Sequence, residues 1–432
     1  MPTSPDTLDD WLAWQMRQHP REIELGLDRI RAVWTRLGAP RAARTRITVG
    51  GTNGKGSTVA LLEAMLAAGG HRVGTFTSPH LLRYNERVRV GGVEADDARL
   101  VAAFARIEDA RDDVPLTYFE FGTLAALLIF AESQLDVALL EVGLGGRLDA
   151  VNMIDADAAI VTTVDLDHQD WLGSDRELIA HEKAGIFRPG RPAIIGEPDP
   201  PRALLAHAQT IGADARVFGR DFHAGTRDAS SWFWESGDVR LQLPRPGLQA
   251  PCQIANAAAA IAALHELRER IPWQPQAIAE GVASARVAAR LQRFPGPPEL
   301  IVDVAHNPQA ARVLADWLSA NPCGGRTIAV FGVLADKDVP GIVEPLHPAI
   351  DAWHLAGLDA QSPRGLDAPS LGGIVAGFPD VRVAGTHGCV DDALQVARST
   401  AGDDDRIVAF GSFFVAAAAL AAQSRPHTMH RD

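Results

Sequence analysis

A glycine-rich turn near residue 50 lies between a strand candidate and a helix candidate, and this order limits the folds open to the chain. The β-branched run from Arg46 to Gly50 leads into GTNGKGS at 51–57, and the helix-like segment TVALLEAMLAAGG follows. A second strand candidate, RVGTF, comes next, so the unit reads strand, loop, helix, strand. Such a unit predicts a parallel sheet with helices on its faces.

Further apolar runs continue this pattern along the first half of the chain. DVALLEVG at 136–143 and AAIVTTVD at 158–165 are strand candidates separated by polar or glycine-rich turns. The carboxyl ends of parallel strands share one edge of a sheet, so we expect the motifs after them to lie there. Residues 220–250 differ, because Trp232, Trp234 and the alternating run DVRLQL predict a small antiparallel insertion. A plain surface hairpin is favoured there, with a substrate-facing flap as the alternative.

A proline-rich passage near residue 290 predicts the boundary between two domains. An alanine-rich helix is expected over 256–270, and the pattern then restarts with strands ELIVDVA, RTIAVFG and RIVAFG and helices after Pro308 and Pro340. We predict an α/β fold with an N-terminal P-loop-type, mostly parallel sheet flanked by helices and a smaller C-terminal α/β domain. The expected limits are 1–288, a linker at 289–298, and 299–432 with a frayed tail from residue 423.

Composition excludes several classes of protein. The 432 residues are 47% hydrophobic, which is enough for two globular cores. A net charge of −13 disfavours a general nucleic-acid binder, although backbone amides and a few basic residues can still bind an anion. The chain shows neither a membrane-spanning run nor a signal-like start, so a cytosolic protein is expected. The cysteines are too few for a disulfide framework or a zinc site: Cys252, Cys323 and Cys389.

The turn at 50–57 carries the sharpest chemical signal. Its glycines let backbone N–H groups face a phosphate at a helix N-terminus, and Lys55 adds a positive charge. The usual P-loop reads GxxxxGK[ST], whereas Gly56 here separates Lys55 from Ser57, and Val49 occupies the first glycine position. We predict phosphate binding, with a purely structural turn as the alternative.

Two polar residues follow strand candidates downstream. Glu141 stands near the end of DVALLEVG, where a carboxylate can reach a nucleotide's metal ion, or where it is simply solvated. The GLGGRLD segment after it is rich in glycine and predicts a loop close to a ligand. His168 stands in DLDHQDWLG, but Mg²⁺ prefers oxygen donors and a lone histidine is more often structural. The residues alone leave the role of His168 open.

Seven segments in order between residues 51 and 308 resemble folylpolyglutamate synthases: GTNGKGS, TSPHLLRYNERVRV, LTYFEFGT, LEVGLGGRLDA, LDHQDWLG, HEKAGIF and VDVAHNP. The chain is most similar to the bacterial bifunctional branch, dihydrofolate synthase/folylpolyglutamate synthase, in the Mur ligase superfamily. The similarity covers nearly everything except the insertion and the tail. It implies an ATP- and Mg²⁺-dependent monomer that ligates L-glutamate to 7,8-dihydropteroate and to reduced folates through an acyl phosphate.

The resemblance also implies roles for single residues. The family's ATP loop corresponds to Thr52, Asn53, Gly54, Lys55, Gly56 and Ser57. Other ATP contacts correspond to Asn256 on the adenine side and to Arg290, Asp303 and His306 near or within the second domain. The implied metal ligands are Ser78, Glu141 and His168. The residues expected on the pteroate side are Phe119, Phe121, Gly146, Arg147, Leu148, Asp149 and Ala150.

The resemblance implies that Lys55, Lys183 and His306 act in catalysis. Lys183 in HEKAGIF corresponds to a lysine that is carbamylated in the family; an unmodified surface or phosphate contact is the alternative. The family's PGR(F/L) segment appears here as Ala288-Ala289-Arg290-Leu291. Arg290 therefore matches better than Arg293, and the alternative is that both arginines only solvate the linker.

Two other functions remain as alternatives. A Mur-type peptidoglycan ligase shares the acyl-phosphate chemistry, but it usually has a UDP-binding domain before the glycine loop, where this chain has about fifty residues. LTYFEFGT also matches the folate group. A nucleotide-binding regulator without ligase activity is less favoured, because it has little need of Glu141, His168 and Lys183 together.

Overall fold

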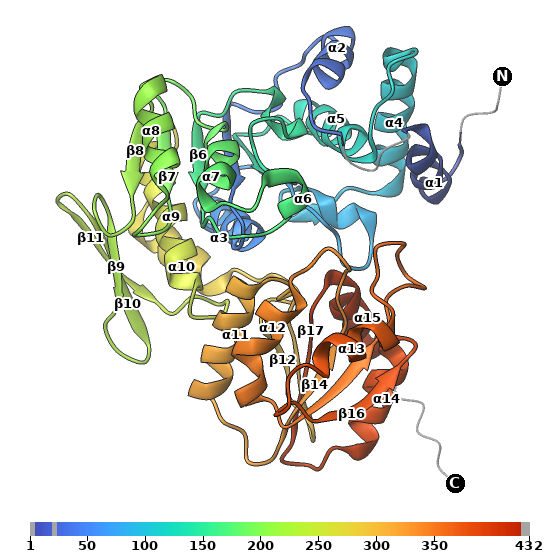
Figure 1. Ribbon diagram of the computed structural model, residues 1–432. Helices are drawn as coiled ribbons and strands as arrows, with labels where there is room; N and C mark the ends of the chain where they lie inside the picture. Colours follow the sequence, from blue (N-terminus) through green and yellow to red (C-terminus); the bar gives the residue numbers. More distant parts are fainter. Residues whose placement is uncertain (1–4, 20–23, 425–432) are drawn as a thin grey trace. The chain divides into compact units, whose positions relative to one another are not determined.

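The computed structural model describes residues 5–19 and 24–424, which form two compact units (Figure 1). The first unit takes Met1–Asp165, Leu172–Gly247 and Gln253–Arg286. The second takes Leu166–Trp171, Leu248–Cys252 and Val287–Asp432. Two short segments thus belong to the second unit although their neighbours belong to the first. The expected fraying of the tail concerns residues that, from 425 on, lie outside the described ranges.

An eight-stranded sheet forms the centre of the first unit, in the order β4-β3-β2-β5-β1-β6-β7-β8. From β2 to β8 in this order the strands are parallel, whereas β3 pairs antiparallel with β2 and β4 pairs antiparallel with β3. The strands are β1 (Thr45–Gly50), β2 (Val73–Phe76), β3 (Val88–Val90), β4 (Val93–Glu94), β5 (Val137–Glu141), β6 (Ala158–Val161), β7 (Pro192–Ile195) and β8 (Asp214–Val217).

Helices cover both faces of this sheet. On one face α3 packs on β1, β2 and β5, α9 packs on β6 and β7, and α10 lies against α3. On the other face, alternate strand residues such as Ala138 and Leu140 share a core with α1, α2, α4, α5, α7 and α8. The helices are α1 (Leu8–Gln18), α2 (Asp28–Arg36), α3 (Lys55–Ala68), η1 (Tyr84–Arg87), α4 (Asp97–Arg111), α5 (Tyr118–Ala131), η2 (Ala150–Met153), α6 (Gln169–Leu172), α7 (Arg176–Ala184), α8 (Arg202–Ile211), α9 (Gln253–Glu266) and α10 (Pro275–Ser284).

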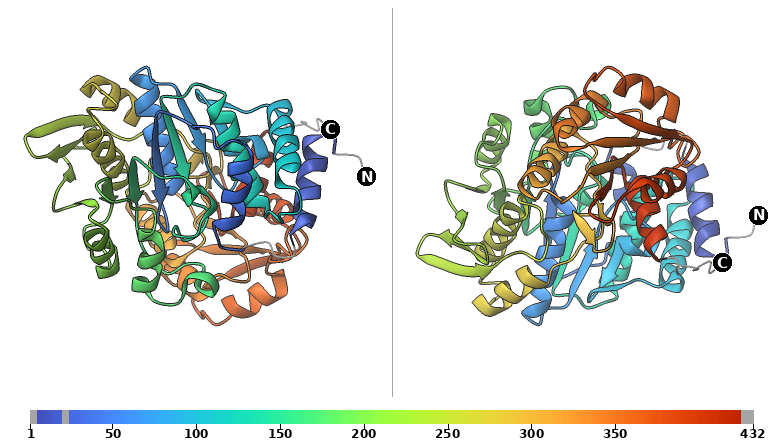
Figure 2. Two further views of the ribbon diagram at one scale, coloured as in Figure 1. Left: turned by 90° about the horizontal axis from the view of Figure 1, so that it is seen from above. Right: turned by 90° about the horizontal axis from the view of Figure 1, so that it is seen from below.

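The insertion expected over 220–250 is an antiparallel three-stranded sheet at the edge of this unit, beside α9 (Figure 2). Trp232 and Trp234 lie on the same face of β10, and both are fully buried. Nε1 of Trp234 donates a hydrogen bond to the carbonyl of Ala258 at 3.1 Å. This packing favours a structural hairpin over a flap. The strands are β9 (His223–Thr226), β10 (Ser231–Ser236) and β11 (Val239–Pro244).

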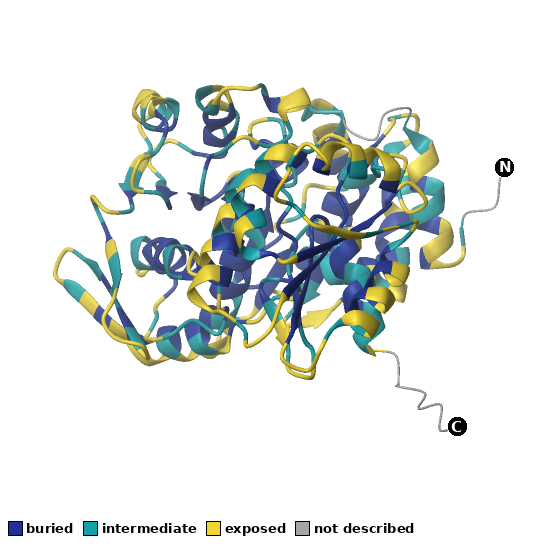
Figure 3. Ribbon diagram, turned by 60° about the horizontal axis from the view of Figure 1, so that its bottom comes forward, coloured by how far each residue is buried: buried dark blue, intermediate teal, exposed yellow. Residues whose placement is uncertain are grey.

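The second unit contains a six-stranded sheet in the order β12-β13-β17-β14-β15-β16, parallel except for β12. Its inner strands are buried, whereas its helices have exposed outer faces (Figure 3). The elements are β12 (Gln292–Phe294), β13 (Glu299–Val302), α11 (Pro308–Ala320), β14 (Thr327–Phe331), α12 (Val339–Leu346), η3 (His347–Ala349), β15 (Ala352–Ala356), α13 (Ala368–Val375), β16 (Val383–His387), α14 (Val390–Thr400), β17 (Arg406–Phe410) and α15 (Phe413–Ser424).

The passage expected to be a linker, 289–298, has a different structure. It belongs to the second unit, where β12 pairs antiparallel with β13 and Gln292 lies opposite Val302. The Pro-Gly-Pro-Pro run at 295–298 is therefore the connection of a hairpin. Proline and glycine serve turns as well as linkers, and the sequence alone did not separate the two uses.

The predicted fold class is confirmed by these two sheets. The first unit has the mostly parallel sheet flanked by helices, and the second has a smaller α/β sheet. Within the described residues, the structure contains no helix with the length and apolar character needed to cross a bilayer.

The close packing of α10 on α3 gives a stability prediction. A Cβ at Gly281 would overlap the backbone of Met65, so we expect Gly281→Ala to destabilise the first unit by about 1–3 kcal/mol. The matched control is Gly373→Ala in α13, where a Cβ meets nothing within 4 Å and alanine favours the helix by about 1 kcal/mol. Scanning calorimetry of both variants checks this. Equal melting temperatures for the two would contradict the packing argument.

Candidate active site

The loop between β1 and α3 has a backbone that suits only glycine at two points. Gly51 has a φ of 140° and Gly54 a φ of 87°, in the region that side chains rarely adopt. A Cβ at Gly51 would overlap Oγ1 of Thr162, and one at Gly54 would lie 2.5 Å from Oδ1 of Asn256. The loop therefore lies directly against the end of β6 and the first turn of α9.

Hydrogen bonds from the end of β6 fix this loop. The N–H of Thr52 donates to the carbonyl of Thr163 at 2.7 Å, and Oγ1 of Thr162 donates to the carbonyl of Asn53 at 2.6 Å. The Thr52 hydroxyl donates to the carbonyl of Asp165 at 3.1 Å. A fixed curl of backbone at the start of a helix is a ready-made site for phosphate.

Lys55 is the first residue of α3, and its ammonium lies back over the loop. Nζ donates to the carbonyl of Gly51 at 3.0 Å and to that of Thr52 at 3.1 Å. The first turn of α3 contains no acidic side chain, so the partial positive charge of the helix N-terminus is not offset there. The turn predicted to bind phosphate thus has the geometry and the charge for it.

A buried network of side-chain amides lies behind the loop. The sequence analysis identified one of its members, Asn256, but not Gln253. Nε2 of Gln253 donates to Oγ of Ser57 at 3.3 Å, and Nδ2 of Asn256 donates to Oε1 of Gln253 at 3.0 Å. Gln253 is the first residue of α9, so it joins the starts of two helices. The motif around Asn256 was the only available signal for it. The structure thus brings Asn256 and the glycine loop together.

Glu141 and Ser78 meet at the carboxyl ends of adjacent parallel strands. Phe76 of β2 lies opposite Leu140 of β5, so the residues that follow share one edge of the sheet. Glu141 is 3% exposed, and its Oε2 accepts a hydrogen bond from the N–H of Ser78 at 3.0 Å. The carboxylate of Glu141 and the hydroxyl of Ser78 both carry the oxygen ligands that a hard divalent cation prefers. These residues therefore fit the expected metal.

His168, the third expected metal ligand, belongs to the second unit, whereas Ser78 and Glu141 belong to the first. Across residues 5–19 and 24–424, no three His, Cys, Asp or Glu side chains gather as a metal site. The complete set of Ser78, Glu141 and His168 stays a prediction.

The loop after Gly143 packs against the end of α7. The N–H of Arg147 donates to the carbonyl of Glu182 at 2.8 Å, and its guanidinium pairs with the Glu182 carboxylate at 2.8 Å. A Cβ at Gly146 would lie 2.8 Å from the same carbonyl, so this approach requires glycine. Lys183, which follows Glu182, is 4% exposed. The structure therefore brings Lys183 together with residues 143–150, the predicted substrate loop.

Asp149 closes this loop on itself. Its carboxylate accepts from the N–H of Leu144 at 2.8 Å and from that of Val151 at 3.0 Å, which caps η2 at Ala150. Burial raises the pKa of Asp149 to about 6, although the backbone hydrogen bonds and the charge of Lys55 act against this rise. The substrate loop and the glycine loop thus share one electrostatic environment. The carbonyl of Leu148 accepts from the N–H of Gly26 at 3.3 Å.

The two phenylalanines of α5 have different surroundings. Helix α5 begins with a capping box, in which Thr117 and Glu120 bond each other's backbone N–H groups. Phe119 is partly buried, and its ring centre lies 5.7 Å from that of Phe76 in a tilted arrangement. The Phe119 ring occupies the space where a Cβ of Gly143 would fall. Phe121 is 0% exposed, in the core against Trp14 and Phe104. Phe119 therefore faces the substrate loop, whereas Phe121 packs behind it.

In the second unit, Asp167 is the centre of a buried polar network. Its carboxylate lies 2.7 Å from Nζ of Lys337, 3.0 Å from Nδ2 of Asn307 and 3.4 Å from Nε2 of His306. Burial raises the pKa of Asp167, but the hydrogen bond from His306 and the charges of His306, His168 and Lys337 outweigh it and hold that pKa well below its usual range. Sequence reasoning missed Asp167 and Lys337, although each follows a parallel strand, as the predicted site residues do.

Arg290, Asp303 and His306 also lie together in this unit. The carboxylate of Asp303 accepts from the N–H groups of Leu291 at 2.6 Å and Ala305 at 2.7 Å. Burial raises the pKa of Asp303, and the charge of Arg290 opposes the shift. The Arg290 guanidinium lies 5.4 Å from the centre of the Phe413 ring. The centre of the His306 ring lies 6.0 Å from the centre of the same Phe413 ring. The three predicted residues therefore share one polar region with Phe413, which the sequence reasoning missed.

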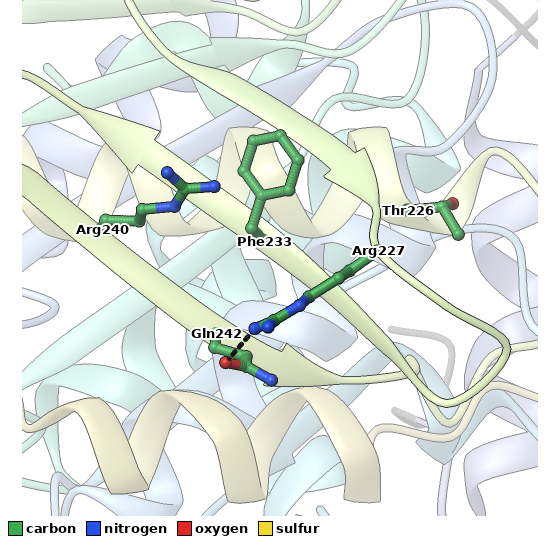
Figure 4. Close-up of a pocket in the computed structure, with 5 residues that line it drawn as sticks. All are labelled: Thr226, Arg227, Phe233, Arg240 and Gln242. Carbon is green, nitrogen blue, oxygen red and sulfur yellow. Dashed lines mark hydrogen bonds between the residues drawn. The ribbon is translucent and has the colours of Figure 1, made fainter.

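A separate hollow lies on the outer face of the three-stranded sheet (Figure 4). The Arg240 guanidinium lies over the Phe233 ring at 4.9 Å, and Arg227 donates to Gln242 at 2.5 Å. Thr226 completes the lining. The hollow contains none of the predicted site residues, so we place no step of the chemistry there.

Comparison with known proteins agrees with the predicted family. Residues 49–264 match the Mur ligase middle domain, and residues 289–413 match the Mur ligase glutamate ligase domain. The dihydrofolate synthase/folylpolyglutamate synthase of Escherichia coli K12 is 43% identical over 96% of this chain and 95% of its own length. The structure of E. coli FolC with DHPP and ADP has a TM-score of 0.91 at 42% identity, covering 98% of this chain and 99% of that one. A bifunctional folylpolyglutamate synthase/dihydrofolate synthase with Mn, AMPPNP and L-glutamate bound has a TM-score of 0.89 at 42% identity, covering 98% and 99%.

The buried carboxyl of Asp149 gives a pH prediction. Its pKa is about 6 in the folded protein and about 4 in an unfolded chain, so its stabilising contribution is complete below about pH 4 and is lost as the pH rises through about 6. The side-chain amide of the Asp149→Asn variant cannot ionise. As the pH rises across this window, the free energy of unfolding of the variant should therefore increase relative to that of the parent protein by up to about 3 kcal/mol. Calorimetric melting temperatures of both proteins from about pH 4 to 7 test this. A difference that stays constant with pH would contradict it.

Proposed function

Because this chain belongs to the Mur ligase family, in its dihydrofolate synthase/folylpolyglutamate synthase branch, we propose that it adds L-glutamate to 7,8-dihydropteroate and to reduced folates. It is an ATP-dependent ligase of folate metabolism that uses a divalent metal ion. The observation that carries the assignment is the set of sites in the first unit. There the glycine loop bears Lys55, Glu141 meets Ser78, and the 143–150 loop lies against Lys183.

The ATP phosphates are proposed to bind the amides of the 52–57 loop. Lys55 neutralises part of their charge, as a mobile ammonium at a helix N-terminus does. Asn256, whose amide lies against Gly54, is proposed on the adenine side. Ser78, Glu141 and His168 are the proposed ligands of Mg²⁺. When bound, the metal ion supplies positive charge at the transferring phosphate.

The pteroate or folate is proposed to bind beside the 146–150 loop. Phe119 is the proposed aromatic contact because it faces this loop, while Phe121 supports it from the core. Carbamylation of Lys183 is also part of the proposal. A buried ammonium is costly, and the modification would replace its positive charge with a carboxylate next to the substrate loop.

Arg290, Asp303 and His306 are further proposed ATP contacts. Arg290 and His306 supply donors for phosphate oxygens, and Asp303 orders the backbone next to Arg290 through its bond from Leu291. A guanidinium and backbone amides can stabilise negative charge that develops in the transition state.

In the proposed reaction, the substrate carboxylate attacks the γ-phosphate of ATP and forms an acyl phosphate with release of ADP. The amine of L-glutamate then attacks the acyl carbon, and phosphate leaves a tetrahedral intermediate as the amide forms. No covalent bond to the protein is needed. The residues must align the reactants, balance charge and keep water from the acyl phosphate.

The two other functions now have less support. A Mur-type ligase acting on a UDP-sugar shares the domains, but the full-length relatives at high identity are dihydrofolate synthase/folylpolyglutamate synthases. A regulator that binds nucleotide without ligation has no use for the substrate loop against Lys183.

We further propose that both activities reside in this one protein and that it works as a monomer in the cytosol.

The substrate assignment is tested by ATP-dependent product formation with Mg²⁺ and L-glutamate. Dihydropteroate, a reduced folate monoglutamate and a UDP-MurNAc substrate are compared, and mass spectrometry identifies the products. We expect glutamate addition to both pteridines. Addition to one alone would restrict the activity, and activity on the UDP-sugar alone would overturn the assignment.

The role of Lys55 is tested with Lys55→Ala. Loss of the ammonium at the ATP phosphates should lower kcat/KM by about 100- to 1,000-fold and weaken AMPPNP binding measured by calorimetry. The matched control is Arg240→Ala on the three-stranded sheet, which also removes a positive charge and should ligate as the parent does. Normal ligation by Lys55→Ala would remove the centre of the proposed mechanism.

A further inference from the structure

Lysine is rare in this chain, although positive charge is not. Of the 41 lysine and arginine residues, only Lys55, Lys183 and Lys337 are lysines. The first two stand in the proposed ATP loop and beside the substrate loop. Arginine and lysine are not interchangeable, because the guanidinium is larger and planar and the ammonium is compact. In a chain that supplies nearly all its positive charge as arginine, the third lysine needs a structural reason.

Lys337 lies in the second unit, in the turn between β14 and α12, and its side chain is buried. Its Nζ lies 2.7 Å from Oδ1 of Asp167 and 3.5 Å from Oδ2 of Asp336. The side chains of Lys337 and Asp167 are 5% and 8% exposed. The Arg364 guanidinium pairs with the other oxygen of Asp336 at 3.0 Å. The space at Lys337 is therefore bounded by two carboxylates and already has a guanidinium at its outer side.

Asp167 holds a short segment of chain in the second unit. Leu166–Trp171 is counted with this unit, whereas Asp165 and Leu172 on either side are counted with the first. The ion pair with Lys337 and the hydrogen bond from Asn307 fix the Asp167 carboxylate. His168 comes next and has a φ of 50°, a conformation that is uncommon outside glycine. Fixing Asp167 thus fixes the backbone from which the His168 ring projects.

We propose that Lys337 is a positioning residue for the metal site, and that its ammonium acts through Asp167 to orient His168. This inference rests on the proposed function, because His168 is a metal ligand only within it. Lys337 itself contacts neither metal nor substrate in this role. Residues that orient metal ligands from behind commonly change metal affinity or activity by 10- to 100-fold when they are replaced.

The nature of the ion pair explains why lysine is kept. Removing one partner of a buried pair leaves the other partner with less compensation for its charge. Without the Lys337 ammonium, the Asp167 carboxylate would turn toward Asn307 and His306 and carry the segment with it. An arginine at position 337 would keep the charge, but its planar group does not fit between two carboxylates spaced for one ammonium. Charge alone should therefore not restore the arrangement.

The test measures Mn²⁺ binding in the presence of AMPPNP by electron paramagnetic resonance, which requires no turnover. Lys337→Met should weaken Mn²⁺ binding by about tenfold or more, and the Mg²⁺ concentration for half-maximal ligation should rise in parallel. The KM for dihydropteroate should not change, because the substrate loop belongs to the first unit. Lys337→Arg should recover less than half of the lost affinity.

The matched control is Arg326→Met. Arg326 pairs with Asp405 at 2.7 Å, in the same unit but before the start of β14 rather than after its end. This control should bind Mn²⁺ as the parent does, which separates loss of a nearby ion pair from general loosening of the unit. Lys337→Gln serves in place of the methionine variant if that variant melts early.

Three results would overturn the inference: unchanged Mn²⁺ affinity in the Lys337 variants, an equal loss in Arg326→Met, or full recovery in Lys337→Arg. Failure of the parent protein to ligate any pteridine is a separate outcome, because it removes the proposed function. Mn²⁺ binding would still decide whether Lys337 governs a metal site.

Discussion

The positions of the site residues in the first unit depend on the parallel alignment of β2, β5, β1 and β6. It brings four strand ends to one edge, so Ser78, Glu141, the glycine loop and Thr162 become neighbours there although they are far apart in sequence. The strands are buried on both faces by helices, which keeps this edge in register. The close contact at Gly51 follows, because a curled loop after β1 meets the end of β6 with no room for a side chain.

The chemistry is divided between two units, and each fixes its own share of polar groups. In the first, backbone amides and a buried carboxylate dominate, and Gln253 links the starts of α3 and α9. In the second, charged side chains dominate and converge on Asp167 and Asp303. Backbone sites change little with conformation, whereas ion pairs depend on both partners being held. The segment with His168 belongs to the second kind, so its place depends on groups distant in sequence.

Sequence reasoning reached the features that local patterns encode. Glycine spacing, β-branched runs and alternation identified the loop at Gly54, the strand ending at Glu141 and the antiparallel insertion that contains Trp232 and Trp234. It could not reach features that depend on pairing across the chain. Lys337 and Asp167 lie 170 positions apart, and no local signal relates them. The hairpin connection at 295–298 could not be predicted for the same reason, since a proline run fits a turn and a linker equally well.

The backbone around Arg290 shows how a departure from the family pattern can leave geometry intact. Ala289 and Leu291 have φ values of 54° and 50°, which cost L-residues about 1–2 kcal/mol each. Such strain persists where surrounding contacts over-determine it, and here Asp303 bonds the N–H of Leu291 while Phe413 lies beneath the guanidinium. Alanine thus keeps the left-handed turn that the family's glycine would favour. Arg293 instead pairs with Glu299 at 2.7 Å on the hairpin. Arg290 is therefore the arginine held beside Asp303 and His306, and its strained backbone is consistent with a functional position.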